Sequence, residues 1–550
     1  MSALALTLTL AVPSQQAWLP AEFPISYWLG PPVENNNLQA WQLIRDCNFT
    51  IAGPYWGYST DENLKMLDFC RQLGLTAIVS DPRINWRIVI EDNWQDTVRQ
   101  VLADYDSHPA TCGYYLQDEP NYEVFQPLGL LSQEFQRQSP AHLPYINLFP
   151  TYANVQQLGT PTYAHHLDKY LSIVKPAVLS YDHYCLLAEG RDRPDYFENL
   201  GLIREYGLRY GVPPWNIIQA LQYSPAVREP SDGEMRWQVY TSLAYGMKGI
   251  MYFTYWQGIV DPDGKPTRLY PIVQQLNGEM RALGKTLLGL TSTGVFHTGE
   301  IPLGATRLGS DSVVALPQDL PLVIGFFRDE GAREYVMIAN RDYSQPVTFD
   351  ATFLPHVAGL SLISARDGSE EPLALTDHKA SFELPPGDGR LLRLTTEFSY
   401  PKPPQPLTEI NFQFDDDNDT AGWGERNSLS PPVVKGGTMT MTFTGADPYI
   451  VRSWLRLQPD QYSKLRVRMR LPACDAQGQL FWTTDESPGF ADDKYLNFAV
   501  IPDGAWHEYE IPVGDHENWR GKAVRGIRLD PTTGEAQPGS KVEIDWIVGE

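Results

Sequence analysis

The chain has 550 residues, which is too long for a single hydrophobic core and predicts two to four domains. Its composition, with 42% hydrophobic and 20% charged residues, is that of a globular protein. The formal net charge of −24 argues against nucleic acid as a partner, because phosphate binding relies on clusters of Lys and Arg. The same charge disfavours a strongly anionic polysaccharide.

The first residues, 1–17, combine a short apolar run with a small residue near a plausible cleavage point. This pattern resembles a signal peptide that lacks its basic N-terminal region, and a disordered tail is the alternative. We therefore expect a secreted or periplasmic protein. No other apolar stretch approaches the ~20 residues that cross a bilayer, so no transmembrane segment is expected.

From residue 18 to about residue 295, short apolar runs alternate with amphipathic helical patterns such as 62–74 and 96–108. The predicted strands are 23–30, 49–57, 75–81, 111–120, 144–152, 177–184, 216–224 and 249–257. Ser231 and Glu234 form a predicted capping box at the start of the helix before the last strand. Eight such units predict a (β/α)₈ barrel over 18–295. A doubly wound sheet is the alternative, but no Gly-rich phosphate loop follows any strand.

The C-terminal ends of the strands carry the chemistry in such barrels. Here these ends are rich in acidic, amide and aromatic side chains. They include Trp28, Trp56, Asp81, Asp118, Glu119, Asn147, Asp182, His183, Tyr184, Gln219, Gln222 and Trp256. Such a lining suits a neutral polyol such as a sugar.

The segment GYYLQDEPN, residues 113–121, is the strongest local signal. It resembles the end of the fourth strand in the barrel clan of retaining glycosidases, which includes β-galactosidases, cellulases and mannanases and carries Asn-Glu-Pro there. The resemblance implies that Glu119 is the general acid/base. Asp118 replaces the Asn that grips the sugar 2-hydroxyl in that clan. A neighbouring negative charge would raise the pKa of Glu119.

Glycosidases need a second carboxylate, which the clan supplies as a Glu at the end of the seventh strand. This chain has Gln219 and Gln222 there, and an amide can neither attack an anomeric carbon nor accept a proton from water. We take Asp182 as the candidate nucleophile or base, with Asp118 and Asp81 as alternatives.

The remaining residues of the strand ends are predicted to contact the sugar. Trp256 resembles the indole that floors the central subsite in the clan, and core packing is the alternative. Asp118, Trp28, Trp56, Asn147, His183, Tyr184, Gln219 and Gln222 complete this set. His183 has no metal-ligand partners at useful spacing, so no metal site is expected in the barrel.

Short alternating runs over 296–397 predict a small β-sandwich, and the Pro-rich segment 398–409 predicts a linker. Residues 410–550 resemble the galactose-binding-like β-sandwich modules of polysaccharide-degrading enzymes. Candidate glycan-binding aromatics are Trp423, Trp454, Trp482 and Trp519, with core packing as the alternative. The acidic run Asp415, Asp416, Asp417 and Asp419 suggests a structural Ca²⁺, with a solvated loop as the alternative.

The sequence thus predicts a glycoside hydrolase for a poly- or oligosaccharide, with no organic cofactor required. The absence of an acid at the seventh strand favours one rival. That rival is a non-catalytic barrel that only binds glycan.

Overall fold

The computed structural model describes residues 18–309, 312–396, 408–417, 419–453, 455–487, 489–534 and 536–550. The predicted signal segment 1–17 and all but the last two residues of the predicted linker 398–409 lie outside them. The chain divides into two compact units, Met1–Ser399 and Tyr400–Glu550.

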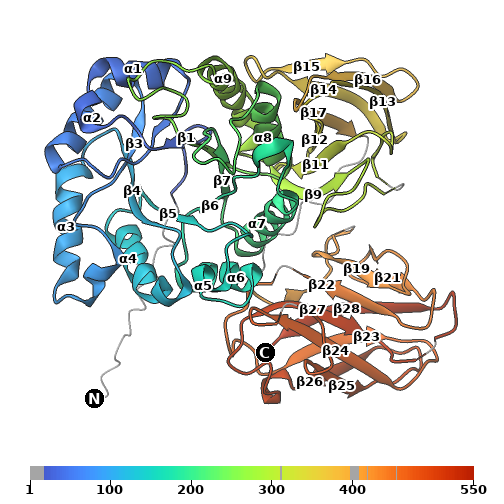
Figure 1. Cartoon of the computed structure of the whole chain (residues 1–550). Coiled ribbons are helices and arrows are strands. Elements are labelled where there is room, and N and C mark those ends of the chain that lie inside the picture. The colour runs from blue at the N-terminus through green and yellow to red at the C-terminus, as the bar shows by residue number, and fades with distance from the viewer. Residues whose placement is uncertain are drawn as a thin grey trace, which may run out of the picture. The chain divides into compact units, whose positions relative to one another are not determined.

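The first unit contains the predicted barrel, formed by one eight-stranded parallel sheet (Figure 1). Its strands are β1 (Ile25–Trp28), β2 (Ile51–Ala52), β3 (Thr76–Val79), β4 (Thr111–Asp118), β5 (Leu143–Leu148), β6 (Leu179–Asp182), β7 (Pro214–Gln219) and β8 (Gly249–Phe253). The paired order runs from β1 through β8 down to β2, and Thr50 links its two ends. Thr50 N donates to Ile25 O at 3.0 Å, and Ile25 N donates to the Thr50 hydroxyl at 2.9 Å. All eight predicted strands are confirmed.

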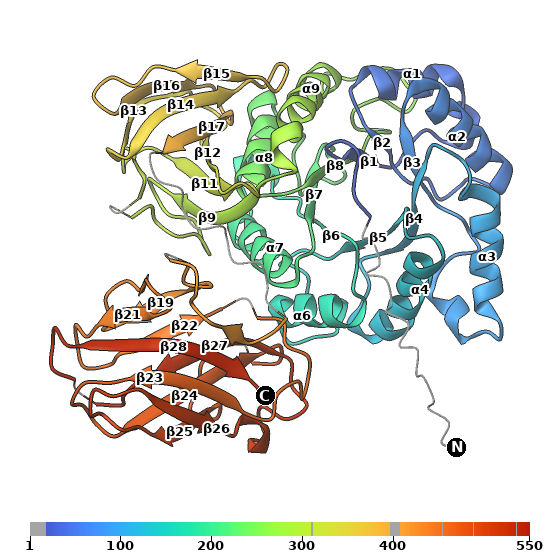
Figure 2. The same cartoon turned by 180° about the vertical axis from the view of Figure 1, so that it is seen from behind.

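The helices surround this ring of strands (Figures 1 and 2). They are α1 (Leu38–Asp46), α2 (Thr60–Leu73), α3 (Trp94–Tyr105), α4 (Phe125–Gln138), α5 (Val155–Leu158), α6 (Tyr163–Ile173), α7 (Tyr196–Tyr210), α8 (Asp232–Ala244) and α9 (Tyr270–Leu287). The predicted capping box is present at α8: Glu234 N donates to Ser231 Oγ at 3.3 Å, and Ser231 N donates to Glu234 Oε2 at 2.7 Å.

Alternation along the strands separates two apolar clusters, because successive strand residues face opposite sides of the sheet. One cluster packs the strands against the helices. The other fills the barrel and includes Trp28, Ile51, Ile78, Cys112, Tyr145, Trp215, Ile217 and Met251. The five cysteines of the chain, all within the described residues, are free thiols.

The small sandwich belongs to the same compact unit as the barrel. Its six-stranded sheet has the order β15-β14-β17-β12-β11-β9, and its three-stranded sheet has the order β10-β13-β16. The strands are β9 (Thr291–His297), β10 (Val314–Ala315), β11 (Leu322–Arg328), β12 (Glu334–Asn340), β13 (Val347–Phe353), β14 (Val357–Ile363), β15 (Glu370–Leu373), β16 (Lys379–Leu384) and β17 (Gly389–Thr396).

The centre of the six-stranded sheet is buried on both faces. Along β12, Val336 and Ile338 belong to the sandwich core, whereas Tyr335, Met337 and Ala339 belong to the barrel core. Helix α8 lies between the barrel strands and this sheet (Figure 1).

The approach of the sheet to α8 is close enough to require a glycine. A Cβ at Gly325, on β11, would lie 2.1 Å from the carbonyl oxygen of Ala244. The sandwich is therefore packed directly against the backbone of α8.

The second unit is the predicted C-terminal β-sandwich, with sheets ordered β20-β21-β28-β23-β26 and β19-β22-β27-β24-β25, and with β18 paired to β28. Its strands are β18 (Asn411–Phe412), β19 (Trp423–Asn427), β20 (Val433–Val434), β21 (Met439–Thr442), β22 (Tyr449–Arg452), β23 (Leu465–Arg470), β24 (Gln477–Thr484), β25 (Tyr495–Ala499), β26 (His507–Ile511), β27 (Val524–Asp530) and β28 (Lys541–Gly549).

Three of the candidate glycan-binding tryptophans belong to the core of this unit. Trp423, Trp482 and Trp519 are each at most 2% exposed, so their indoles offer no platform to a glycan. Trp454 lies outside the described residues.

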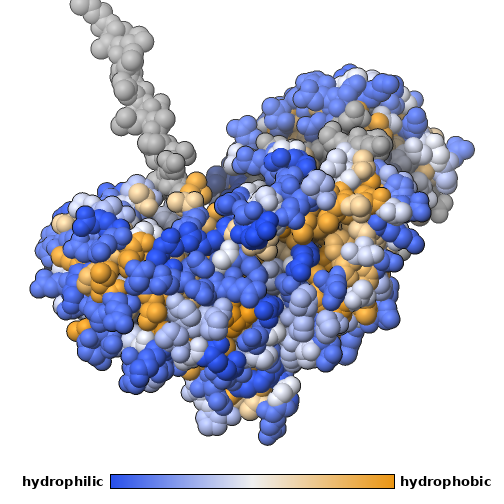
Figure 3. All heavy atoms as spheres, turned by 90° about the horizontal axis from the view of Figure 1, so that it is seen from above, coloured by the Kyte–Doolittle hydropathy of each residue, from blue (hydrophilic) through white to orange (hydrophobic). Residues whose placement is uncertain are grey.

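Hydrophilic residues dominate the face shown in Figure 3, and hydrophobic residues form separate patches there, as expected for a chain with 20% charged residues. Within the described residues, no helix is both long enough and apolar enough to span a membrane.

Candidate active site

Three neighbouring barrel strands bring an acidic cluster together at their C-terminal ends. Asp118 ends β4 and Glu119 follows it, Asn147 lies near the end of β5, and Asp182 ends β6. In the register of the sheet, Asp118 lies opposite Asn147, and Asn147 lies opposite Ser180. The predicted acids of the fourth and sixth strands therefore meet at one edge of the barrel.

Asn147 bridges the two aspartates. Its Nδ2 donates to Asp118 Oδ1 at 3.1 Å and to Asp182 Oδ1 at 2.8 Å. Its Oδ1 accepts a hydrogen bond from Ser180 Oγ at 3.2 Å. Its amide holds the two acids in place, and Asn147, like Asp182, is 2% exposed. The contact of Asn147 with a sugar stays a prediction.

Glu119 is half-buried and has an unusual backbone. Its φ of 41° lies in the left-handed region, which few non-glycine residues adopt and which is enriched at functional sites. Its N donates to Asn147 O at 2.8 Å, and its negative charge is among the causes that raise the pKa of Asp182. The turn after β4 thus binds the backbone of Glu119 to β5, the strand next to the one that carries Asp182.

Burial and mutual repulsion raise the pKa of each carboxyl in the cluster. Burial, assisted by the negative charge of Asp118, raises the pKa of Glu119 to about 7. Burial raises the pKa of Asp118 to about 6. The pKa of Asp182 is well above its ordinary value because it is buried, and the charges of Glu119 and Asp118 add to this effect. Near neutral pH the cluster therefore retains at least one proton.

Aromatic side chains adjoin the acids on the β6 to β8 side. Burial raises the pKa of Tyr184, and the negative charges of Asp182 and Asp118 contribute. Tyr184 lies two residues after Asp182 in the chain. The Tyr184 ring contacts Phe253 at 4.7 Å and Tyr223 at 5.4 Å between ring centroids. Tyr223 is 44% exposed and is therefore available to a ligand.

A second aromatic group adjoins the acids on the β1 to β4 side. Tyr115 contacts Trp28 at 5.8 Å and Trp56 at 5.3 Å between ring centroids, and the charges of Asp118 and Glu119 contribute to its raised pKa. Trp28 is 7% exposed, whereas Trp56 is 40% exposed. Of the two predicted tryptophans, Trp56 has the accessible indole.

Gln219 does not face the site. It is 0% exposed, and its amide is hydrogen-bonded to the backbone of two loops. Its Oε1 accepts from Leu186 N at 3.0 Å. Its Nε2 donates to Leu186 O at 3.3 Å and to Arg228 O at 2.7 Å. The predicted sugar contact of Gln219 is therefore contradicted, because its polar atoms already bind the backbone. Gln222 lies exposed in the loop after β7, and its contact with a sugar stays a prediction.

His183 and Trp256 are also buried. His183 is 0% exposed, faces Asp195 at 3.5 Å and lies edge-on to Tyr152 and Tyr196. Neither ring nitrogen of His183 is accessible to a sugar hydroxyl, which corrects its predicted role.

Trp256 is 5% exposed and belongs to the core that packs the barrel against its helices. A Cβ at Gly264 would lie 2.9 Å from the edge of its indole, so the loop after β8 covers this ring. The prediction that Trp256 stacks on a sugar is corrected to core packing.

Asp81, an alternative for the second carboxylate, forms a structural ion pair. Its oxygens accept from Arg83 Nε at 2.8 Å, from Arg83 Nη2 at 2.7 Å and from the Tyr105 hydroxyl at 2.7 Å. These hydrogen bonds lower the pKa of Asp81 despite its burial. Asp81 is therefore unsuited to a role in proton transfer near neutral pH.

Four residues of the site were not among those predicted from the sequence: Tyr115, Tyr152, Tyr223 and Arg193. Arg193 stacks over Tyr152 at 3.8 Å and donates from Nε to Tyr184 O at 3.2 Å. Tyr115 and Tyr223 contact residues that the sequence did predict for the site. The aromatic composition of the strand ends was the only feature of the sequence that could have indicated them.

Within the described part of the chain, no three His, Cys, Asp or Glu side chains are grouped to hold a metal ion. In the acidic run of the C-terminal unit, Asp417 Oδ1 accepts from Gly436 N at 2.7 Å and Asp419 Oδ1 accepts from Ala421 N at 2.8 Å. The Ca²⁺ site stays a prediction.

No protein-family model and no curated protein matches this sequence. Solved glycoside hydrolases with barrel folds do match it. A β-galactosidase from the psychrophilic Marinomonas ef1 matches with 11% identity over 48% of this chain and 62% of that chain, with a TM-score of 0.38. This chain thus spans less than two thirds of that β-galactosidase.

Two further matches cover more of their chains. The isomalto-dextranase of Arthrobacter globiformis T6, complexed with panose, has 12% identity over 96% of both chains and a TM-score of 0.41. A glycoside hydrolase of family 5 from Bacteroides vulgatus ATCC 8482 has 11% identity over 69% of this chain and 90% of that chain, with a TM-score of 0.45. Similarity at this level says nothing about activity or substrate.

Proposed function

We propose that this protein is a glycoside hydrolase that cleaves a poly- or oligosaccharide, with Glu119 as general acid and Asp182 as the second carboxylate. The observation that supports this most is the position of the two acids at the C-terminal ends of β4 and β6, on either side of Asn147, with the pKa of Glu119 raised to about 7. A carboxyl with a pKa of about 7 still carries a proton near neutral pH and is suited to protonate a leaving group.

The proposed mechanism is retaining, with Asp182 as the nucleophile. Carboxyl groups lie roughly 5–5.5 Å apart in retaining glycosidases and roughly 6.5–9.5 Å apart in inverting ones, which hold a water between acid and base. Asn147 Nδ2 binds both Asp118 and Asp182, and this compact cluster is the reason for proposing the shorter spacing.

In the first proposed step, an Asp182 oxygen bonds to the anomeric carbon while the glycosidic C–O bond breaks and the leaving oxygen takes the proton of Glu119. In the second step, water attacks the anomeric carbon, Glu119 accepts a proton from that water, and the bond to Asp182 breaks.

The neighbouring side chains are proposed to hold the sugar. Asp118 is placed to accept from a hydroxyl, and its charge contributes to the raised pKa of Glu119. Trp56 and Tyr223 are exposed aromatic side chains beside the acids and are suited to stack on a pyranose face. Tyr184 lies two residues after Asp182 and is proposed to contact the same sugar.

Three predictions from the sequence accompany this proposal. We place the protein in a secreted or periplasmic compartment from the pattern of residues 1–17. The proposed chemistry uses no organic cofactor, and a Ca²⁺ at the acidic run of the C-terminal unit is proposed as a structural element only.

The test is a hydrolysis screen of the natural protein and of Glu119→Gln on a panel of plant and algal polysaccharides. Reducing ends released by the natural protein and lost by about 10²–10⁴-fold in Glu119→Gln support the proposal. Glu123→Gln is the matched control, because Glu123 is exposed four residues farther along. Binding of sugars by both proteins without release of reducing ends would instead support the non-catalytic glycan-binding rival.

A further inference from the structure

Two loops carry the aromatic side chains beside the acids. The first loop, 183–195, follows β6 and contains Tyr184. The second loop, 220–231, follows β7 and contains Tyr223. We infer that Tyr343, in the small sandwich, is a positioning residue that fixes the first loop and hence Tyr184. The effect of this positioning on catalysis rests on the proposed function.

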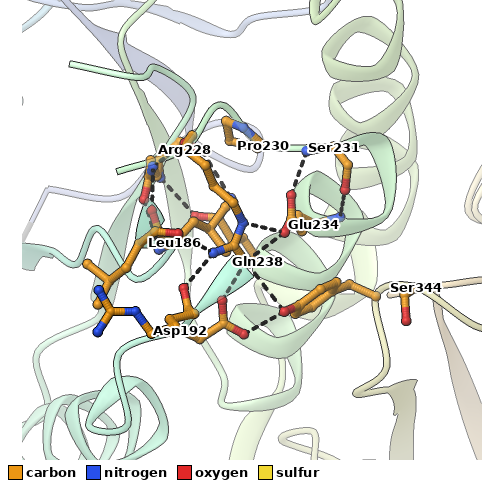
Figure 4. Close-up of polar contacts among 12 residues, drawn as sticks. Leu186, Asp192, Arg228, Pro230, Ser231, Glu234, Gln238 and Ser344 are labelled. Carbon is orange, nitrogen blue, oxygen red and sulfur yellow. Dashed lines mark hydrogen bonds and ion pairs between the residues drawn. The ribbon is translucent and has the colours of Figure 1, made fainter. Parts of the chain in front are cut away.

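Arg228 joins the two loops (Figure 4). It belongs to the second loop, and its Nη1 donates to the carbonyl oxygens of Leu187, at 2.6 Å, and Arg191, at 2.5 Å, in the first loop. Its Nε donates to Glu234 Oε1 at 2.8 Å, which anchors it to the first turn of α8. One guanidinium therefore fixes the first loop to the second and both to a helix.

Asp192 connects this guanidinium to the sandwich. Its Oδ1 accepts from Arg228 Nη2 at 2.5 Å, and its Oδ2 accepts from the hydroxyl of Tyr343 at 2.7 Å. Tyr343 lies between β12 and β13 of the sandwich. The carboxylate of the first loop is thus held from the barrel side by an arginine and from the sandwich side by a tyrosine.

Tyr343 is itself held firmly against α8. Its ring lies edge-on to Trp237 with centroids 5.7 Å apart. A Cβ at Gly233 would lie 2.0 Å from the carbonyl oxygen of Tyr343, so the two backbones touch. A hydroxyl on such a support fixes its acceptor in space.

The first loop transmits this position to the site. Leu187 N donates to Arg191 O and Arg193 N donates to Cys185 O, both at 2.9 Å, so the segment on either side of Asp192 is folded back on itself. Arg193 then donates to Tyr184 O. Displacement of Asp192 would therefore move Tyr184, which lies two residues after Asp182.

The test compares Tyr343→Phe with the natural protein by hydrogen exchange of the Leu187 and Arg193 amides. Loss of one hydrogen bond to a charged acceptor is expected to speed their exchange by about tenfold while amides of β12 stay unchanged. Tyr335→Phe is the matched control: Tyr335 belongs to the same sandwich, and its hydroxyl donates to Asp329 at 3.5 Å, in the sandwich itself. Unchanged exchange in Tyr343→Phe overturns the inference.

A second variant tests the route through Asp192. Asp192→Asn is expected to speed the same amides, and the double variant Tyr343→Phe/Asp192→Asn is expected to exchange less than the product of the single effects predicts. Multiplicative effects would show that the two side chains act independently and would overturn the route.

Kinetics separate this inference from the proposed function. On any substrate that the screen identifies, Tyr343→Phe is expected to lower kcat/KM by about fivefold with an unchanged pH profile, and Tyr335→Phe to leave it unchanged. Faster exchange with unchanged kcat/KM overturns the positioning role. Faster exchange in a protein that hydrolyses no glycan supports the fixing of the loop and overturns only the proposed function.

Discussion

Asn147, near the end of β5, donates from Nδ2 to Asp182 Oδ1 at 2.8 Å and to Asp118 Oδ1 at 3.1 Å, so one amide holds the acids of two strands. Burial raises the pKa of both aspartates, and the charge of Asp118 adds to the raised pKa of Glu119. The protonation of Glu119, on which the proposed reaction depends, therefore responds to charge changes on its neighbours.

The activity of the proposed enzyme is expected to fall above about pH 7, because Glu119 must be protonated and its pKa is raised to about 7. Asp118→Asn removes a charge that raises this pKa, so the alkaline limb is expected to move to lower pH by about half a unit to one unit. The measurement is kcat/KM against pH, with Glu123→Gln as the control. If the alkaline limb of the kcat/KM profile does not move in a folded Asp118→Asn variant, the result contradicts Glu119 as the titrating acid.

Asp182→Asn is expected to abolish turnover and to stabilise the fold at alkaline pH. The pKa of Asp182 is raised in the folded state, so its contribution to stability is fully present below the unfolded pKa of about 3.9 and is lost as pH rises through the folded pKa. Asparagine avoids this loss, for an expected gain of about 1–2 kcal/mol at pH 8 relative to pH 4. Urea unfolding at both pH values measures it. A stability difference that does not change with pH would refute the repulsion described for this cluster.

Gln219→Ala is expected to lower stability by about 2–4 kcal/mol, because it leaves the backbone groups of Leu186 and Arg228 without their partner. Gln222→Ala, at an exposed position in the same segment, is the control and is expected to change stability by less than about 0.5 kcal/mol. The measurement is the free energy of unfolding in urea. If Gln219 instead contacted a sugar, its loss would raise KM and leave the unfolding curve in place.

Trp56→Ala is expected to raise KM about tenfold with little change in stability, because its indole is 40% exposed beside the acids. Trp256→Ala is expected to destabilise the barrel by about 3–5 kcal/mol, since that indole is buried in the core. Substrate titration and urea unfolding of both variants separate the two roles. An unchanged KM in Trp56→Ala would remove Trp56 from the proposed sugar site.

Much of the barrel could be predicted because its signals are local. Alternating apolar runs located all eight strands, and the capping box at Ser231 follows from two residues three positions apart. The position of a strand end in turn placed Glu119 and Asp182 at the same edge of the sheet. These predictions needed only periodicity and order along the chain.

Whether an individual side chain is buried or reaches the site depends on segments far away in the sequence. The Gln219 amide is hydrogen-bonded to Leu186, 33 residues away, and Trp256 is covered by the loop that contains Gly264. In the C-terminal unit, Phe481 and Trp482 are adjacent, and only the packing of two sheets decides that Trp482 is the buried one. Partners of this kind have no local signal.

The six-stranded sheet that contributes to two cores also sets how this protein can be divided. A chain ended at residue 295 would leave Trp237 and Tyr240 of α8 facing water, and a separate sandwich would expose Met337 and Leu391. Shuffling of the barrel alone onto other partners is therefore disfavoured, and barrel and sandwich are expected to be inherited, expressed and engineered as one piece.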